Sequence, residues 1–498
     1  MAPRLSGFSC KMNFKTSSNL NDTQLQSGLK YIVKEGLAGE VMVNLTGGTF
    51  LIAMVLHLGA TNFQIGLLAA LPIFANVFQL VSVWLVKKYE NRRSIALVSS
   101  FIARFALITL GILPFAFTGL GSVEVLIYLL SIHYLFGSIA GGSWNSWMKD
   151  LVPDSMLGKY FSHRTKLMQI ISVSSNLLIA IFLDYLKTHS PENLTQSYYM
   201  IILAGAFAGM LGLYWLSKAD EPKPLPATEN VFLQMAKPLK DVNFRNLLIF
   251  NSFWAFALNL AVPFFTVFMM KTIGLSLTYI MALMIIGQLS GIFSIKMWGR
   301  YADRYSNKTI INICGPLYIV CIFAMVFAAI PGQLLYSIII LLVINIFSGI
   351  SVSGITLALN NIGMKLAPAQ HATAYISTKN IVISLASAIA PMLGGLAADF
   401  FTTHQLVWTI EWRSVSGNSA LNMINLHGWN FFFIIGGILA IFSLKTLSNV
   451  KETGEVNKDR VAIYLRGRMR KNIARGAKSI APVFNSNGVK NGFRYFFT

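Results

Sequence analysis

The chain has 498 residues, of which 55% are hydrophobic and only 12% are charged. Soluble proteins carry about 25% charged residues, so this composition excludes a simple soluble enzyme, a disordered protein and a collagen-like chain. The net charge of +21 would suit a nucleic-acid-binding protein, but the basic residues gather in alternate loops between apolar stretches. We therefore expect no nucleic-acid partner. The cysteines, Cys10, Cys314 and Cys321, lack the density and spacing of a disulfide scaffold or a metal site.

Twelve apolar stretches are long enough to cross a membrane as helices, which predicts an all-α multi-pass membrane protein. The predicted helices cover residues 34–58, 63–86, 94–117, 123–148, 166–186, 197–217, 246–270, 277–298, 309–330, 334–362, 373–400 and 429–447. A polar stretch with three prolines, 218–245, divides them into two bundles of six helices, 34–217 and 246–448. We interpret this stretch as the linker between the bundles.

Polar segments flank and interrupt these bundles. Residues 1–33 form a tail that lacks the apolar core and cleavage site of a signal peptide. Residues 401–428 are a long loop on the outer side, placed to cover the outer mouth. The tail 449–498 is strongly basic. Either it forms a helix on the anionic inner leaflet, or it is a solvated basic tail.

Orientation follows from the positions of Lys and Arg. With the N-terminus in the cytoplasm, only Lys187, Lys271 and Arg413 lie on the opposite side, and only Arg104 lies within a span. All other basic residues fall in cytoplasmic loops, helix ends and tails. The asymmetry predicts that both termini are cytoplasmic. We expect the cell membrane, the inner membrane of a bacterium, as the location.

The two halves match each other at a constant offset of 215 positions through five helices. The repeat pairs Asn44 with Asn259, Asn145 with Asn360 and Asp184 with Asp399. Two six-helix halves in the same orientation indicate a parallel repeat about an axis along the membrane normal. The two aspartates lie at equivalent outer helix ends, where they are either structural or part of an outer gate.

In the loop after the eighth predicted helix, Gly299, Asp303, Arg304 and Lys308 are spaced as Gly-x-x-x-Asp-Arg-x-x-x-Lys. This spacing resembles the loop motif of the major facilitator superfamily, and the helix count, the repeat and the motif position agree with that family. The resemblance implies two pseudo-symmetric six-helix bundles and a cytoplasmic gate, with Asp303 facing a helix N-terminus of the other half. In the equivalent first loop only the last basic residue is kept, as Arg93. Alternatively, the motif is a solvated turn whose charges set the topology.

A second loop, between the fourth and fifth predicted helices, contains Asn145, Asp150 and Arg164. Its Trp-x-x-Trp segment is similar to the corresponding loop of some bacterial members of that superfamily. The similarity implies that these residues belong to the cytoplasmic gate, together with Asn360. Alternatively, the tryptophans belong to the aromatic belt at the membrane interface.

Two ionisable residues lie inside predicted helices, where a charged group is costly and is a functional candidate by default. Glu40 lies in the first helix, which lines the central cavity in this superfamily, so it is the candidate proton-coupling residue. Alternatively, it lies at the wet inner mouth or is paired structurally. Arg104 lies in the third helix, at the level of Asn76 and close to that of Gln79. It either forms a structural cluster with these amides or binds substrate.

Polar and aromatic side chains in the spans are candidates for the substrate cavity. Asn44 and Asn259 are related by the repeat, and two amides facing one cavity suit a polar solute. Each of them equally well bonds a neighbouring helix. His133, Trp254 and Gln288 are further candidates of the same kind.

These features predict a secondary active transporter that moves a small organic solute by alternating access, with protons as the coupling ion. An uncoupled facilitator and a non-transporting membrane receptor remain alternatives. The sequence contains no catalytic cluster, metal-ligand set or nucleotide-binding loop, so we expect no enzyme activity, no cofactor and no metal. We expect a monomer whose partners are its solute, protons and a bilayer with an anionic inner leaflet.

Overall fold

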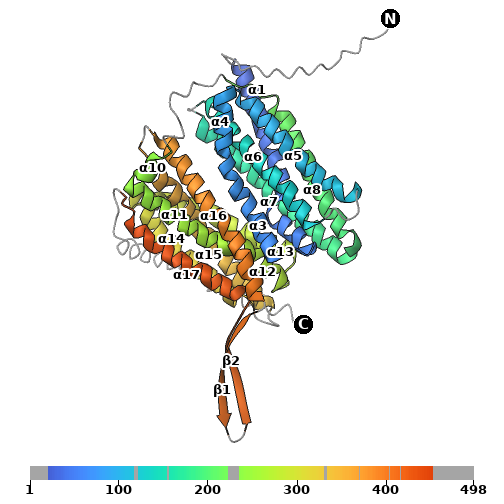
Figure 1. Ribbon diagram of the computed structural model, residues 1–498, viewed down its shortest axis with the longest axis vertical. Helices are drawn as coiled ribbons and strands as arrows, with labels where there is room; N and C mark the ends of the chain where they lie inside the picture. Colours follow the sequence, from blue (N-terminus) through green and yellow to red (C-terminus); the bar gives the residue numbers. More distant parts are fainter. Residues whose placement is uncertain are drawn as a thin grey trace, which may run out of the picture.

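The computed structural model describes residues 21–452, except 117–121, 154–155, 223–234, 330–333, 369–370, 403 and 415–416. Within these residues, twelve helical segments are long and apolar enough to cross a membrane, as the sequence predicts. They form two bundles that lie side by side (Figure 1).

Each bundle contributes six spans, some of them divided into two helices. The first bundle comprises α1 (Asp22–Thr46), α2 (Gly48–His57), α3 (Asn62–Ala75), α4 (Gln79–Tyr89), α5 (Arg92–Ala116), α6 (Val123–Leu151), α7 (Leu157–His189) and α8 (Leu194–Leu216). The second comprises α11 (Val242–Ala261), α12 (Pro263–Lys271), α13 (Leu277–Arg304), α14 (Asn307–Ala324), α15 (Leu334–Leu366), α16 (Ala372–Thr402) and α17 (Trp429–Thr446). A short helix, α10 (Lys237–Lys240), precedes the second bundle.

The molecule has two ends, which differ in the elements that lie there. The linker face is the end where α1 and α11 begin, α4 and α17 end, and α10 lies (upper end of Figure 1). The hairpin face is the opposite end, where α2 and α12 finish and α3 and α13 begin. From it projects an antiparallel pair of strands, β1 (Gln405–Ser414) and β2 (Gly417–His427). The loop predicted at 401–428 is thus largely a β-hairpin.

Helix ends differ from the predicted spans because polar residues continue or cap the helices beyond the apolar stretch. α1 begins at Asp22 rather than at residue 34, with the Gln24 side chain accepting the Asn21 amide at 3.1 Å. α3 begins after Thr61, whose hydroxyl accepts the Gln64 amide at 3.2 Å. Such caps satisfy amides that have no partner in the first helical turn. Hydropathy alone therefore places the starts of these helices too late in the chain.

The first and seventh spans are broken at repeat-related positions. α1 gives way to α2 at Gly47–Gly48, where Gly48 takes a left-handed φ of 57° that favours glycine. α11 gives way to α12 at Val262–Pro263, because proline has no amide hydrogen to continue the helix. Broken helices inside a membrane transport fold mark the place where polar backbone lines a cavity. In both spans the break lies nearer the hairpin face than the linker face, and we take this level as the candidate position of the site.

The repeat continues after the hairpin with a larger offset. Gly205 on α8 packs against Leu45 and Thr46, and Gly436 on α17 packs against Ala261, the repeat partner of Thr46. The offset between Gly205 and Gly436 is 231 positions instead of 215. The sixteen additional positions lie between α16 and α17, so the hairpin is an insertion in an otherwise symmetric architecture.

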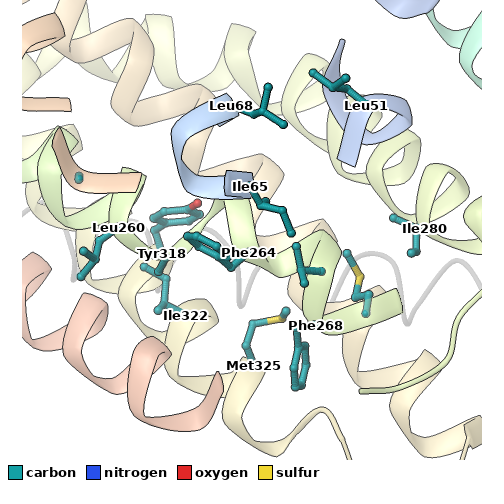
Figure 2. Close-up of a cluster of buried hydrophobic side chains, with 14 of the residues drawn as sticks. Leu51, Ile65, Leu68, Leu260, Phe264, Phe268, Ile280, Tyr318, Ile322 and Met325 are labelled. Carbon is teal, nitrogen blue, oxygen red and sulfur yellow. The ribbon is translucent and has the colours of Figure 1, made fainter. Parts of the chain in front are cut away.

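The two bundles share an apolar core near the hairpin face. Figure 2 shows Ile65 of the first bundle close to Phe264 of the second, within a buried cluster that also contains Leu51 and Phe268. In lipid, such contacts are stabilised by close van der Waals packing rather than by the hydrophobic effect.

Glycines bring α3 and α16 into backbone contact at this core. A Cβ at Gly66 would lie 2.1 Å from the Pro391 carbonyl oxygen, and one at Gly395 would lie 2.4 Å from the Asn62 carbonyl oxygen. Both positions therefore require glycine, and α3 is held tightly against the other bundle.

Candidate functional site

Two aspartates join the bundles at the hairpin face. Asp184 of α7 accepts the backbone amides of Leu277 and Thr278, at the start of α13, at 3.1 and 2.7 Å. Asp399 of α16 accepts the amides of Asn62 and Phe63, at the start of α3, at 3.2 and 3.0 Å. It also accepts the Asn62 side chain at 2.9 Å. Each carboxylate thus caps a helix that belongs to the other bundle.

The two caps are related by the repeat, both in the carboxylates and in the residues whose backbone amides they accept. Asp184 and Asp399 are equivalent, and the capped residues Leu277 and Thr278 are the equivalents of Asn62 and Phe63. A carboxylate at a helix N-terminus satisfies unpaired amides and complements the helix dipole. Because the bonds are charge-assisted, each is stronger than a neutral hydrogen bond. The hairpin face is therefore closed by a symmetric pair of inter-bundle contacts.

At the linker face, carboxylates also cap the starts of helices, but here the acid and the helix belong to the same bundle. Glu221, after α8, accepts the amides of Arg92 and Arg93 at 2.9 and 3.0 Å, at the start of α5. Glu452, after α17, accepts the amides of Asn307 and Lys308 at 3.3 and 2.9 Å, at the start of α14. These carboxylates fasten the sixth span to the third, and the twelfth to the ninth.

The last basic residue of each loop motif takes part in these fastenings. Arg93 donates to the Ser217 carbonyl, and its repeat partner Lys308 donates to the carbonyls of Ser448 and Val450, at 3.4 and 2.8 Å. In the described part of the chain, the hydrogen bonds and ion pairs of the linker face join residues of one bundle, or of one bundle and the linker. The contacts named here thus join the two bundles to each other at the hairpin face, and join helices of a single bundle at the linker face.

The remaining residues of the predicted gate lie at the linker face, on their own bundles. Asp303 and Arg304 are exposed in the last turn of α13, and Gly299 lies one turn earlier on that helix. Asn145 and Asn360 are both exposed near the ends of α6 and α15.

Asp150 and Arg164 are engaged inside the first bundle. Asp150 forms an ion pair with Arg92. Arg164 pairs with Glu35 of α1 at 3.2 Å, and its guanidinium lies 4.9 Å from the centre of the Trp144 ring. Glu35 was not predicted as a site residue, because it lies at the very start of the predicted first span. Its spacing of one turn and a half from Glu40 was the available signal.

Glu40 is half-buried on α1, and the described residues show no hydrogen bond or ion pair for it. It lies one helical turn from Val43, whose side chain is 55% exposed although α1 packs against both α7 and α8. On α6, a Cβ at Gly137 or Gly141 would meet no atom within 4 Å. The first bundle thus presents an open face that includes α1 and α6, and Glu40 borders it.

The repeat-related amides occupy different environments. Asn44 is buried, donating to Ser175 at 3.0 Å and accepting from Ser172 and Asn176 at 3.2 and 3.3 Å, so it ties α1 to α7. Asn259 is half-buried and donates to the carbonyl of Ala255, one turn earlier on its own helix, at 2.8 Å.

The other candidates for the substrate cavity also differ in exposure, since two are buried and one is exposed. His133 is buried, with its ring Nδ1 3.0 Å from the Ala103 carbonyl oxygen, and Trp254 is packed beside Phe250. Gln288 on α13 is exposed. Within the set, Asn259 and Gln288 are therefore the polar groups that a solute can reach, while His133 and Trp254 pack inside their own bundles.

Arg104 is buried between α5, α8 and α1, where it lies beside Gly209 and Met42. Its Nε has no hydrogen-bond partner among the described residues, and the negative charge of Glu35 acts on it. The predicted amide partners, Asn76 and Gln79, bond each other instead, at 3.3 Å. Arg104 therefore lies inside the first bundle, between α1, α5 and α8, and not with the predicted amides.

A single carboxyl group outside the spans carries a resolved pKa shift in this network. Burial alone would raise the pKa of Glu452, but hydrogen bonds from the Lys308 amide, the Asn307 side chain and Lys365 outweigh it. They hold the pKa below its ordinary value of 4.5. No group of three or more His, Cys, Asp or Glu side chains fit for a metal ion occurs among the described residues.

Comparison with known proteins agrees with this architecture. The sequence model of the Major Facilitator Superfamily matches residues 40–391. No curated protein sequence matches the chain. The nucleoside transporter NupG is similar in structure, with a TM-score of 0.61, 13% identity and coverage of 87% of this chain and 100% of that one.

Two xylose transporter structures are similar to the same degree. The D-xylose-proton symporter has a TM-score of 0.61 and 13% identity, covering 87% of this chain and 98% of that one. The inward open conformation of the xylose transporter XylE from E. coli has a TM-score of 0.58 and 13% identity, covering 86% of this chain and 100% of that one. At such low identity these likenesses show the shared fold.

Proposed function

Because the chain belongs to the Major Facilitator Superfamily, we propose that it is a proton-coupled secondary transporter that moves a small polar organic solute by alternating access. The observation that carries this proposal is the closure of one face by two repeat-related carboxylates, Asp184 and Asp399, each bonded to the other bundle. At the opposite face the equivalent fastenings stay within each bundle. A protein built in this way is able to open and close its two faces in turn.

The linker face is the cytoplasmic one in this proposal. Exposed basic side chains, among them Lys87, Lys88, Lys149 and Arg300, crowd this face. The structure then represents the inward-facing state, closed at the cell exterior. We place the protein in the cell membrane, the inner membrane of a bacterium, as a monomer.

The outward-facing state requires the opposite set of contacts. Asp184 and Asp399 release the amides at the starts of α13 and α3, which water then solvates. At the linker face Asp303, with Gly299 and Arg304 beside it, approaches a helix N-terminus of the first bundle. Arg93 and Lys308 keep their bonds within each bundle, so that each bundle moves as a rigid unit.

The solute binds between the bundles, beside the breaks at Gly47–Gly48 and Val262–Pro263. Asn259 and Gln288 are the accessible amides on the second bundle and make the polar contacts to it. Asn44, His133 and Trp254 position the helices around this space. Nucleosides and D-xylose are named for the structurally similar transporters, and both are polar solutes that amides are able to recognise.

Proton coupling is assigned to Glu40. It is a carboxyl group inside the first span, it borders the open face of the first bundle, and no described cation pairs with it. Glu35, in contrast, is paired with Arg164 at 3.2 Å. A transporter with a proton gradient as its energy source fits the likeness to a D-xylose-proton symporter.

The test is transport by the purified protein in liposomes that contain a pH-sensitive dye, with pools of sugars and nucleosides as solutes. The proposal predicts solute-dependent proton flux, and its loss in Glu40→Gln with solute exchange retained. Glu192→Gln, at an exposed carboxyl group of the hairpin face, is the matched control and leaves the flux unchanged. Proton flux that is unaffected in Glu40→Gln removes this role from Glu40.

Two alternatives give different outcomes in the same assay. An uncoupled facilitator moves radiolabelled solute without proton flux. A non-transporting receptor moves neither across the whole panel. The second result would reject the proposed function.

A further inference from the structure

A groove of about 380 Å³ lies on the second bundle at the linker face, between α11 and α17. It is lined by Phe253, Phe442, Lys445, Thr446, Ser448 and Asn449. Hydrogen bonds fasten the two helices at its end: Asn246 donates to the Asn449 carbonyl at 3.1 Å, and Asn243 exchanges two bonds with the backbone of Lys451. These hydrogen bonds therefore hold the two helices at a fixed separation at the mouth of the groove.

The lining changes from apolar to polar along the membrane normal. Phe253 lies about three turns inside α11, and Phe442 lies about two turns before the end of its span. Their side chains are 56% and 62% exposed. Lys445 follows one turn nearer the linker face, and Ser448 and Asn449 end the span. This order matches a phospholipid, with acyl chains in the membrane and a headgroup at its surface.

Lys445 is an available cation at this mouth. It is exposed, and in the described part of the chain no carboxylate pairs with it. Two acids at the ends of the groove's helices have other partners: Glu452, after α17, bonds Asn307 and Lys308, and Asp241 caps the start of α11. The groove thus combines an apolar wall with one uncompensated positive charge.

The equivalent place in the first bundle is built differently. The repeat puts Tyr214 where Lys445 lies, Lys218 where Asn449 lies, and Tyr31 where Asn246 lies. Lys218 lies over the rings of Tyr214 and Tyr31, at 4.3 and 5.8 Å from their centres. There the cation lies against aromatic rings, whereas in the second bundle no described residue pairs with Lys445, and Phe253 and Phe442 are exposed.

We propose that the groove between α11 and α17 binds a membrane phospholipid with an anionic headgroup. The lipid phosphate contacts Lys445 and the polar end of the span, and an acyl chain lies along Phe253 and Phe442. A lysine at an anionic membrane surface contributes about 1 kcal/mol, which corresponds to about a fivefold preference over a zwitterionic lipid. This site is separate from the solute pathway and does not depend on the proposed function.

The test is native mass spectrometry of the purified full-length protein with equal amounts of phosphatidylglycerol and phosphatidylcholine. Wild type is expected to retain phosphatidylglycerol about fivefold more strongly. Lys445→Ala is expected to lose this preference, and Lys445→Arg to keep it. The matched control, Lys218→Ala, removes a cation from the corresponding end of the first bundle and is expected to keep the preference as well.

Each other outcome overturns the proposal. Equal retention of both lipids by wild type means that the groove does not select an anionic headgroup. An equal loss in Lys218→Ala and Lys445→Ala means that the preference comes from overall charge. Phe253→Ala supplies a second check, since it leaves all charges in place and is expected to weaken retention of both lipids, and unchanged retention would exclude the acyl-chain contact. Unaltered thermal midpoints of the variants confirm that they are folded.

Discussion

The hairpin face and the linker face, at opposite ends of the molecule, are both stabilised by carboxylates that cap the starts of helices. At both, a carboxylate accepts two consecutive amides in the first turn of a helix, and at both the arrangement occurs twice, once in each repeat. At the hairpin face the acid and the helix belong to different bundles, as in Asp184 with α13. At the linker face they belong to one bundle, as in Glu452 with α14.

In the proposed alternating cycle, this difference separates contacts that must break from contacts that must persist. A contact between bundles has to be reversible, since it defines one state of an alternating cycle. A contact within a bundle has to survive the cycle, because rocking requires each bundle to be rigid. Substitutions at the two kinds of cap should therefore have different consequences: loss of stability at the linker face and a change of state at the hairpin face.

The largest effect is expected from Glu452→Ala. The carboxylate is fully buried, and its removal leaves the amides of Asn307 and Lys308 and the Asn307 side chain without their acceptor. Loss of charge-assisted bonds to buried partners costs about 3 kcal/mol. The measurement is thermal unfolding in detergent, with the exposed Glu192→Gln as a control that leaves the midpoint unchanged. Transport in any remaining folded protein should keep its coupling, and an unchanged midpoint would contradict the fastening role.

A smaller effect is expected from Gly66→Ala, at the crossing of α3 and α16. The new methyl group would lie 2.1 Å from the Pro391 carbonyl oxygen, so the two bundles have to separate there. Overpacking of this kind costs about 2 kcal/mol, and the cost applies only to the state in which the hairpin face is closed. Gly137→Ala, where a methyl group meets no atom within 4 Å, is the matched control. Distances between spin labels at positions 192 and 279 should lengthen in the first variant only.

The caps themselves are expected to shift the equilibrium between states by a further, smaller amount. Asp184→Asn keeps the shape but replaces two charge-assisted bonds with neutral ones, a loss of about 1 kcal/mol. That corresponds to about a fivefold rise in the population with an open hairpin face. Asp399→Asn should do the same, and the double variant should show the sum of both. The same spin-label pair measures it, and a fall in thermal stability without a change in distances would mean that the caps are only structural.

Much of the fold could be predicted from the sequence, because hydropathy and the constant offset depend on local composition. The pairing of Asp184 with Asp399 followed from that offset. Their partners did not, since a cap depends on which helix starts lie opposite, and that is a property of the assembled bundles. Glu221 and Glu452 were missed for a related reason: each stands in a polar segment just beyond a span, where a charge usually contacts water. The hairpin was not predicted because the constant offset covers only five helices of each half and ends before the segment that follows α16.

The smallest expected effect is the pH dependence of the stability that Glu452 contributes. Its pKa in the folded protein lies below 4.5, the ordinary value that it takes on unfolding. A group whose pKa is lowered by folding stabilises the fold above the unfolded value, and the contribution is lost as pH falls through the folded value. The difference in thermal midpoint between wild type and Glu452→Gln should therefore be constant above about pH 5 and shrink as the pH falls below 4.5. A difference that persists unchanged at pH 3 would show that shape rather than charge holds α14. Wild type and Glu452→Gln differ only at this carboxyl group, so their paired comparison at each pH, rather than the midpoint of wild type, isolates its contribution.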